Sequence, residues 1–502
     1  MCGIAGVWGE QDEERVRGMV DVQRHRGPDG QGHFASAGAG VLGHARLAIL
    51  DPANGRQPVH SEDGKSTLVA NGMVYNHVAL RRRLEGEHKF ASGSDSETIL
   101  HVFEERGAAT PRSLDGMFAF AIASEGRLVL ARDPIGIKPL YWARLDENGD
   151  GTIQFASELK ALSHLGSRVQ EFPPGAIYDQ SVGLSRYYTV PDRPPVELDP
   201  ETHARRLRDA VETAVRKRLL SDVPVGAFLS GGLDSSIIAA VARKRVLRLR
   251  TFSVGVEGSP DLESARIVAR HIGSDHHEYV YTADEVAEAL PEILYHLESF
   301  DEDLVRSAIP TWFCARLAAR HVKVILTGEG ADELFAGYGY HKDIADEGSL
   351  HRELRDSVTR LHNLNLQRVD RMTMRHGVEA RVPFLDTDLV SLAQSIPPAL
   401  KIERRSGARA VEKWILRKAF EDLLPDEIVG RQKEQFDGGT GTLEIIAAVV
   451  DRLAGPLDVA TYAARHPDQG LRSREECLYH NVLVEQLDRP EAVLANVGRW
   501  RR

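Results

Sequence analysis

The second residue of the chain, Cys2, is a nucleophile at a position where a chain terminus could activate it. If Met1 is removed, Cys2 carries both a thiol and a free α-amine, and an amine beside a nucleophile can serve as its general base. The next residues, Gly3 to Val7, are small and apolar, which suits an inner strand that holds the terminus rigidly. Position alone does not separate this interpretation from an accidental cysteine, so other segments must support it.

Further polar side chains in the first hundred residues could complete a site around this thiol. Arg46 stands alone on an otherwise apolar strand, and a buried arginine needs an anion, which a structural carboxylate could equally supply. Asn71 and Gly72 close a strand and offer a side-chain amide and an unhindered N–H, the donors of an oxyanion hole. A simple Asn-Gly turn is the alternative. Asp95 could bind a substrate or merely belong to a helix cap.

A second chemical motif is the segment Ser230–Ser236, Ser-Gly-Gly-Leu-Asp-Ser-Ser, between a predicted strand and a predicted helix. Glycines let the backbone approach a ligand, and N–H groups at a helix N-terminus bind phosphate. The segment is not a Walker loop, because the Gly-Lys-Ser/Thr ending is missing. A glycine-serine turn that caps a helix is the alternative. Asp234 argues against it, since a carboxylate beside bound phosphate implies Mg²⁺ between them.

Three acids, Glu329, Asp332 and Glu333, follow the end of a predicted buried strand at Thr327-Gly328. In open α/β sheets, ligands bind at such carboxyl ends. The acids would repel one another unless a cation sits among them. Acids that stabilise a helix N-terminus are the alternative. The pattern favours a second anion and metal site on a different part of the chain from Cys2.

The first half of the chain is rich in short apolar segments separated by glycine turns. The predicted strands are Gly40–Leu50, Ser66–Val74, Met117–Ala123, Leu128–Arg132 and Ile153–Ala156. Two stretches of helical character, Glu13–Arg24 and Ser96–Arg106, interrupt them. This order predicts an α+β layered domain with antiparallel sheets over residues 2–190.

The pattern changes after the proline-rich segment Val190–Val196, which is typical of a linker and leads us to place one at residues 191–205. Helices are predicted at Glu201–Leu220, Ser235–Arg245 and Leu262–His271, and strands at Val223–Leu229, Thr251–Val256 and Val322–Thr327. Strands that alternate with helices indicate a parallel sheet wrapped by helices. From about Ser349 onward the chain is predicted to be mostly helical. The second domain is therefore expected to be an α/β domain with a helical end, over residues 206–502.

Composition excludes several classes of protein. The chain has 502 residues, 42% hydrophobic and 27% charged, which is a globular composition with room for more than one core. The net charge of −11 is spread along the chain, and the basic clusters Arg81–Arg83 and Arg243–Arg245 lie in predicted helices and are interpreted as solvated helix faces, so no nucleic-acid partner is expected. No apolar run is long enough to span a bilayer, and the first residues lack a secretory signal. Three cysteines in all argue against a disulfide framework and predict a reducing, cytoplasmic location.

The motifs of the first half together resemble the class II glutamine amidotransferase domain. They are Cys2–Gly6, Arg26–Asp29, Arg46–Ile49, Asn71–Asn76 and Ser94-Asp95. The resemblance implies an N-terminal-nucleophile fold, with two sheets between helices (αββα). It also implies that Cys2 attacks the side-chain amide of glutamine, that Asn71 and the Gly72 N–H stabilise the oxyanion, and that Arg46 and Asp95 bind the α-carboxylate and α-amine. One departure is Met73, where the family usually has a glutamate that helps to bind glutamine.

The second half is similar to ATP pyrophosphatases and, more narrowly, to the asparagine synthetase B family. The motifs are Ser230–Ser236, Thr251–Gly255, Gly258–Asp261, Leu326–Glu333, Gly377–Asp386 and Arg431–Phe436. The resemblance runs from residue 2 to about residue 440, and the tail after it adds no motif. It implies a pyrophosphate loop in the parallel-sheet domain, with ATP as co-substrate and Mg²⁺ as metal.

Roles in the second site follow from the matching positions. The resemblance assigns nucleotide contacts to Leu229, Val254, Thr327 and Gly328, pyrophosphate contacts to Ser230, Gly232, Asp234 and Ser235, and the metal to Asp234 and Asp332. Glu329 is expected to act when the acyl-adenylate forms or when ammonia attacks it, and Lys433 to stabilise charge on the phosphates. Arg306, Glu379 and Arg381 are expected to contact the acceptor.

The implied function is a glutamine-dependent asparagine synthetase, which releases ammonia at Cys2 and amidates an adenylated aspartate, with AMP and pyrophosphate as products. Relatives commonly carry two threonines where this chain has Asp303-Leu304, so a different carboxylic acid is the alternative acceptor. A non-catalytic protein on this scaffold would be expected to lose Cys2, Asp234 or Glu329. Glutamine, ATP and the acceptor acid are the expected partners, and a homodimer is compatible with the sequence.

Overall fold

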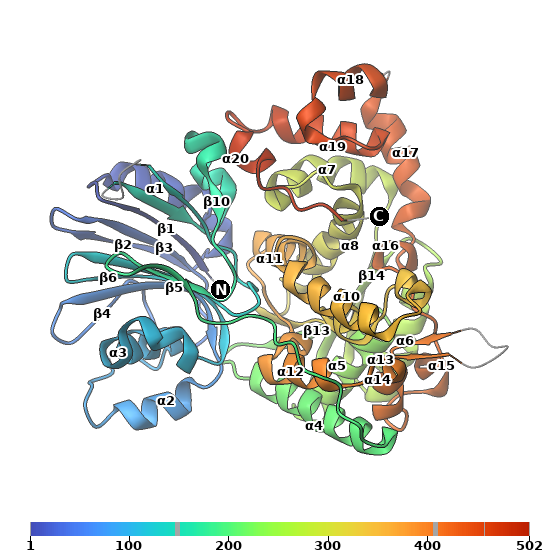
Figure 1. Cartoon of the computed structure of the whole chain (residues 1–502). Coiled ribbons are helices and arrows are strands. Elements are labelled where there is room, and N and C mark those ends of the chain that lie inside the picture. Colours follow the sequence, from blue (N-terminus) through green and yellow to red (C-terminus); the bar gives the residue numbers. More distant parts are fainter. Residues whose placement is uncertain (1, 146–150, 405–409, 456, 501–502) are drawn as a thin grey trace.

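The computed structural model describes residues 2–145, 151–404, 410–455 and 457–500, and its two domains pack side by side (Figure 1). The first domain holds two six-stranded sheets, ordered β10-β8-β9-β1-β3-β2 and β12-β11-β7-β6-β5-β4. All neighbouring strands in them are antiparallel. The strands are β1 Cys2–Trp8, β2 Gly30–Ser36, β3 Gly40–Arg46, β4 Val59–His60, β5 Ser66–Val74, β6 Gly116–Ser124, β7 Arg127–Arg132, β8 Tyr141–Arg144, β9 Ile153–Ala156, β10 Gln170–Glu171, β11 Ala176–Asp179 and β12 Gly183–Arg186.

The sheets form a sandwich because alternate side chains of their strands are apolar and face each other. Ile4 and Leu42 of one sheet share a buried cluster with Val69 and Ala121 of the other. Helix α1 (Glu13–Val22) packs on β1 and β3, whereas α2 (His77–Leu84) and α3 (Asp95–Arg106) belong to the layer beside β5. The αββα arrangement predicted from the resemblance is therefore confirmed, with β1, and so Cys2, at the centre of a sheet.

The second domain is built on a five-stranded parallel sheet with the order β15-β14-β13-β16-β17. Its strands are β13 Val225–Phe228, β14 Arg250–Gly255, β15 Asp275–Val280, β16 Val324–Leu326 and β17 Glu379–Arg381. The helices of this part are α4 Pro200–Arg218, α5 Leu233–Arg243, α6 Pro260–Ile272, α7 Ala283–Leu297, α8 Glu302–Ala318 and α9 Ala331–Phe335. The predicted α/β domain is confirmed, although the edge strands β15 and β17 were not predicted from the sequence.

The remainder of the chain is mostly helical, as predicted. Its helices are α10 Glu347–Arg360, α11 Asn365–Arg375, α12 Thr387–Ser395, α13 Pro398–Lys401, α14 Trp414–Ala419, α15 Asp426–Val429, α16 Phe436–Gly439, α17 Thr442–Ala454, α18 Val459–Arg465, α19 Arg474–Glu485 and α20 Glu491–Leu494, beside a short hairpin of β18 Ile402–Glu403 and β19 Val411–Glu412. Between the domains, helix α4 already begins at Pro200, inside the segment predicted as a linker. None of the described helices is both long and apolar enough to cross a membrane.

Charged side chains, almost completely buried, join the two domains. The ion pairs are Arg26–Asp370 at 2.8 Å, Arg26–Glu158 at 2.9 Å, Lys138–Asp370 at 3.4 Å, Lys160–Glu158 at 2.6 Å, Lys160–Glu298 at 3.4 Å, Arg371–Glu158 at 3.3 Å and Arg371–Glu298 at 2.8 Å. Buried charges persist only where partners compensate their lost hydration, so each domain supplies partners that the other needs. Helix α11 carries two of these charges, Asp370 and Arg371, and lies at the boundary.

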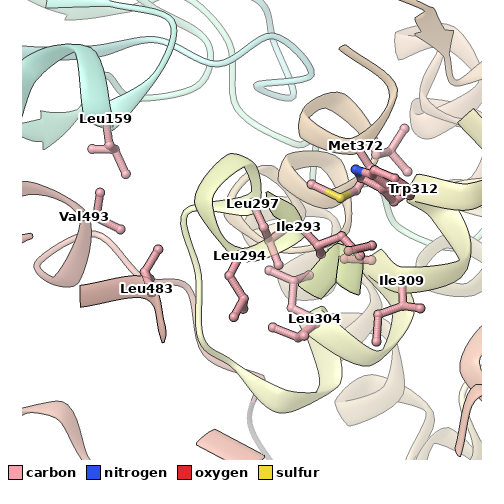
Figure 2. Close-up of a cluster of buried hydrophobic side chains, with 14 of the residues drawn as sticks. Leu159, Ile293, Leu294, Leu297, Leu304, Ile309, Trp312, Met372, Leu483 and Val493 are labelled. Atoms are coloured by element: carbon pink, nitrogen blue, oxygen red, sulfur yellow. The ribbon is translucent and has the colours of Figure 1, made fainter. Parts of the chain in front are cut away.

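The C-terminal tail also spans the boundary. Figure 2 shows Leu159 of the first domain pointing toward Val493 of α20, with Leu483 of α19 close by in the same apolar cluster. Asn496 donates through its side-chain amide to the carbonyl oxygen of Val169 at 3.0 Å, which fixes the tail against the first domain. The tail, which the sequence left without a role, is part of the core that holds the domains together.

Candidate active sites

Cys2 lies at the start of β1 and is 6% exposed. Its backbone nitrogen donates to Oδ1 of Asn71 at 2.9 Å, and its carbonyl oxygen accepts from Nε of Arg26 at 3.1 Å. Burial raises the pKa of the Cys2 thiol, so ionisation for attack requires a nearby base. The α-amine that removal of Met1 would expose is attached to the same residue and could accept this proton.

Two donors beside the thiol have the arrangement of an oxyanion hole. Nδ2 of Asn71 is completely buried and has no hydrogen-bond partner among the described residues. A buried amide donor without a partner is costly unless a ligand satisfies it. Gly72 must be a glycine, because a Cβ at this position would lie 2.1 Å from the carbonyl oxygen of Met117. The site thus holds an unpaired amide donor, Nδ2 of Asn71, next to the backbone of Gly72, which carries no side chain.

We call the space in front of the thiol the Cys2 cavity; Arg46, Met73, Asp95 and Glu379 are among the residues that line it. Arg46 is held by the carbonyl oxygens of Pro52 and Asp51 at 2.9 and 3.0 Å, and no carboxylate pairs with it among the described residues. The carboxylate of Asp95 accepts from the Val74 N–H at 2.8 Å, and burial raises the pKa of this carboxyl. A free cation and a buried acid at one cavity match an α-amino acid ligand.

Glu379 reaches the Cys2 cavity from β17 of the second domain, so both domains build this site. Nε of Arg381 donates to its carboxylate at 2.6 Å, and Nη1 of Arg381 donates to the carbonyl oxygens of Arg218 and Leu220. The sequence predicts that Glu379 and Arg381 contact the acceptor. The structure instead places Glu379 beside the thiol and aims the Arg381 guanidinium at backbone carbonyls of α4 and its C-terminal end.

A second cavity, of about 140 Å³, lies at the carboxyl ends of the parallel strands, and we call it the loop cavity. The structure brings together here every nucleotide, pyrophosphate and metal residue expected from the sequence: Leu229, Ser230, Gly232, Asp234, Ser235, Val254, Thr327, Gly328, Glu329, Asp332 and Lys433. Gly231, with φ of +70°, packs against Ser264, where a Cβ would come within 2.4 Å. The tight turn leaves the N–H groups at the start of α5 facing the cavity.

A lysine that the sequence did not single out bridges the two acids expected to bind metal. Nζ of Lys413 lies 2.5 Å from Asp234 and 2.6 Å from Asp332, and the side chain is 2% exposed. Nζ of Lys433 pairs with Asp332 at 2.8 Å. Against the effect of burial, Lys413 and Lys433 hold the pKa of Asp332 well below its usual range. Oδ1 of Asp234 remains buried without a hydrogen-bond partner among the described residues, as a metal ligand would.

Glu329 stands at the rim that the loop cavity shares with a third cavity. It forms an ion pair with Arg368 of α11, and burial raises the pKa of its carboxyl although Arg368 opposes the change. Glu333 is hydrogen-bonded to the Tyr338 hydroxyl at 2.6 Å and lines neither cavity. Burial raises the pKa of Glu333 to about 7. Of the three acids, only Glu329 and Asp332 face ligand space.

The third cavity, of about 440 Å³, contains Trp500 of the tail in its wall, and we call it the Trp500 cavity. Its other lining residues are Asp303, Ser307, Glu329, Asp332, Tyr338, Gly339, Tyr340, Asn365, Arg368, Lys433, Gln435, Phe436 and Asp437. Trp500 packs edge-on against Tyr338, and its backbone N–H donates to Asp301 at 3.2 Å. Among the residues that the structure describes, the cations lining this cavity are Arg368 and Lys433, both also near the loop cavity.

Two residues that the sequence predicts to lie near the acceptor, Arg306 and Leu304, have other surroundings in the structure. Nε and Nη2 of Arg306 donate to Glu475 of α19 at 2.8 and 2.7 Å, so the tail neutralises this arginine, which does not line the Trp500 cavity. Leu304 is completely buried in the apolar cluster of Figure 2. Of the two positions where relatives carry threonines, only Asp303 can therefore contact a ligand in this cavity.

A family model described as glutamine amidotransferase domain matches residues 1–182, and one described as asparagine synthase matches residues 206–348 and 342–492. Asparagine synthetase [glutamine-hydrolyzing] 2 of Arabidopsis thaliana is 40% identical over 470 residues, 88% of this chain and 79% of that protein. Asparagine synthetase [glutamine-hydrolyzing] of Asparagus officinalis is 40% identical over 97% of this chain and 85% of its own length.

Among solved structures, a glutamine phosphoribosylpyrophosphate amidotransferase from B. subtilis matches 56% of this chain and 81% of its own, with 20% identity and a TM-score of 0.34.

We predict that Lys413→Met lowers the melting temperature in the presence of a chelator, because Asp234 and Asp332 lose the ammonium between them. Breaking a buried pair typically costs about 3–5 kcal/mol. Added Mg²⁺ should raise the melting temperature of the variant more than that of the wild type, since the metal can then take the vacated position. Lys418→Met, in helix α14 just after Lys413, removes a pair with Glu201 of α4 at 2.6 Å and is the control. Equal responses to Mg²⁺ in both variants would contradict this assignment.

Proposed function

The chain belongs to the family of glutamine-hydrolysing asparagine synthetases, and we propose that it makes asparagine from aspartate, with glutamine as nitrogen donor and ATP as activating co-substrate. The observation that carries the proposal is the pairing of two complete sites on one chain. In the first domain, a buried thiol lies beside the Asn71 amide, a donor without a partner among the described residues, and in the second domain a loop of the pyrophosphate type faces acidic side chains.

In the first site, the Cys2 thiolate attacks the side-chain carbonyl carbon of glutamine. Nδ2 of Asn71 and the N–H of Gly72 stabilise the resulting oxyanion, which preorganised donors in a water-poor site do effectively. Collapse of the intermediate expels ammonia and leaves a thioester, which water hydrolyses to glutamate. Arg46 and Asp95 hold the α-carboxylate and α-amine. Met73 stands where the family usually has a glutamate, and Glu379 of the second domain lines the same cavity.

In the second site, the side-chain carboxylate of aspartate attacks the α-phosphorus of ATP and pyrophosphate leaves. Ser230, Gly232 and Ser235 surround the position of the leaving group, and Lys433 neutralises part of its charge. Mg²⁺ would bind at Asp234 and Asp332 and neutralise further phosphate charge. Since Lys413 bridges these acids here, we propose that its ammonium moves or shares the site when the metal binds.

Ammonia then attacks the acyl-adenylate and AMP leaves. Glu329 lies where the two cavities meet, and its raised pKa suits a group that accepts the proton lost by the attacking nitrogen. We place the acceptor in the Trp500 cavity, where Arg368 would contact its α-carboxylate and Asp303 its α-amine. Ammonia in bulk water would be protonated and unreactive, so it must pass between the sites inside the protein.

Cys2→Ala should remove the glutamine-dependent reaction, by ~10³-fold or more, because no other group forms the thioester. Synthesis from added ammonium salts should continue, since the second site is separate, with asparagine, AMP and pyrophosphate formed in equal amounts. Mass spectrometry of the products with aspartate and a panel of other carboxylic acids measures this. Cys477→Ala, a buried cysteine of the tail, is the control. Release of ADP and phosphate, or a better product from another acid, would overturn the proposed reaction or its acceptor.

Trp500→Ala should raise the KM for aspartate by about tenfold, which corresponds to about 1.4 kcal/mol of lost contact, and leave the KM for ATP unchanged. The reason is that Trp500 lines the Trp500 cavity but not the loop cavity. Trp500→Phe, which keeps an aromatic wall, should restore most of the affinity. Steady-state kinetics with ammonium as nitrogen source isolate this step. A parallel rise in both KM values would show that the tail acts only on general folding.

A further inference from the structure

A cluster of two histidines and two glutamates lies in the first domain, outside the three cavities. Glu62 follows β4, His88 follows α2, and His101 and Glu104 are on α3. One ligand atom from each lies within 4.8 Å of the others. None of the four lines the Cys2, loop or Trp500 cavity, so the proposed reaction does not explain them.

The distances between these atoms match the edges of a tetrahedral metal site. Nδ1 of His88 is 3.3 Å from Glu62 and 3.5 Å from Glu104, and Nδ1 of His101 is 2.7 Å from Glu104 and 3.7 Å from Glu62. Ligands about 2.0–2.1 Å from zinc in tetrahedral geometry are about 3.3 Å apart. These four histidine–carboxylate distances lie on both sides of this value, and all four ligand atoms lie within 4.8 Å of one another.

The hydrogen bonding of the two ring nitrogens of His88 is a second, independent indication of a metal site. Its Nε2 is 3.0 Å from Glu105, an acceptor-only group, so Nε2 carries the proton and Nδ1 has a lone pair when the ring is neutral. Nδ1 is buried, in a side chain that is 10% exposed, and has no hydrogen-bond partner among the described residues. A lone pair that faces two carboxylates is repelled unless a cation lies between them.

His101 also directs its Nδ1 into the cluster, but with a different proton arrangement. This nitrogen is hydrogen-bonded to Glu104, an acceptor-only group, at 2.7 Å, so a metal ion would have to displace its proton. The side chain is 1% exposed, and its Nε2 lies 3.7 Å from Glu97 without a hydrogen-bond partner among the described residues, whereas Nε2 of His88 has the carboxylate hydrogen bond that orients metal-binding histidines. Glu97 is itself fixed by the N–H groups of Ala91 and Ser92.

We propose that Glu62, His88, His101 and Glu104 bind a zinc ion. Two neutral imidazoles and two carboxylates suit Zn²⁺ and leave the site without net charge, and four protein ligands define a structural rather than a catalytic metal. The ion would link the turn after β4 and the loop after α2 to helix α3. Because α3 begins at Asp95, it would also stabilise one wall of the Cys2 cavity.

The test is a calorimetric titration of the chelator-treated full chain with Zn²⁺, together with the visible absorption of added Co²⁺ and the melting temperature. The wild type should bind one zinc ion more than Glu104→Gln, show the intense bands of four-coordinate Co²⁺, and melt at a higher temperature with zinc. Glu104→Gln keeps the size of the side chain, and Glu62→Gln, at a residue on the surface, is a second variant that should fold.

Both variants should bind zinc at this site at least tenfold more weakly, whereas Glu87→Gln, an exposed neighbour, should behave as the wild type. Equal zinc stoichiometry and affinity in the wild type and both cluster variants would overturn the proposal. So would a six-coordinate Co²⁺ spectrum, since it would show that the four side chains do not form a tetrahedral metal site.

Discussion

The buried ion pair between Arg26 and Asp370 is the contact on which the arrangement of the two sites depends. Arg26 also holds the carbonyl oxygen of Cys2, so one guanidinium connects the nucleophile to the second domain. Charges that are removed from water require their partners, and losing one partner of a buried pair typically costs about 3–5 kcal/mol. If the domains separated, these buried charges would be exposed to water or left without their partners. The network therefore holds the two sites at a constant distance.

Residues of helix α11 contact both sites and so connect them. Along one short segment, Arg368 pairs with Glu329, Val369 lines the loop cavity and Asp370 pairs with Arg26. Glu379 of β17 adds a second element that belongs to one domain and lines the cavity of the other. The proposed transfer of ammonia through the protein needs such a fixed interface, because a gap between mobile domains would admit water and protonate it.

The sequence predicted what local patterns encode and missed what only tertiary contact creates. Cys2 and the segment Ser230–Ser236 are recognisable because the chemistry is contiguous in the chain. Lys413 bridges Asp234 and Asp332 from far along the chain, with no motif around it. Trp500 lines the Trp500 cavity from a tail without a motif, and Arg306 pairs with Glu475 of that tail. The antiparallel and parallel sheets followed from the order of predicted strands, turns and helices, whereas the edge strand β17, Glu379–Arg381, was too short to be recognised.

The central claim, that nitrogen passes between the sites inside the protein, is tested by isotope competition. The enzyme is supplied with glutamine labelled with ¹⁵N in its side-chain amide, together with ATP, aspartate and an equal concentration of unlabelled ammonium, and the asparagine is examined by mass spectrometry. Internal transfer predicts asparagine that retains nearly all of the ¹⁵N label in its amide. Label diluted in proportion to the ammonium in solution would show that ammonia escapes and returns, and would contradict the account.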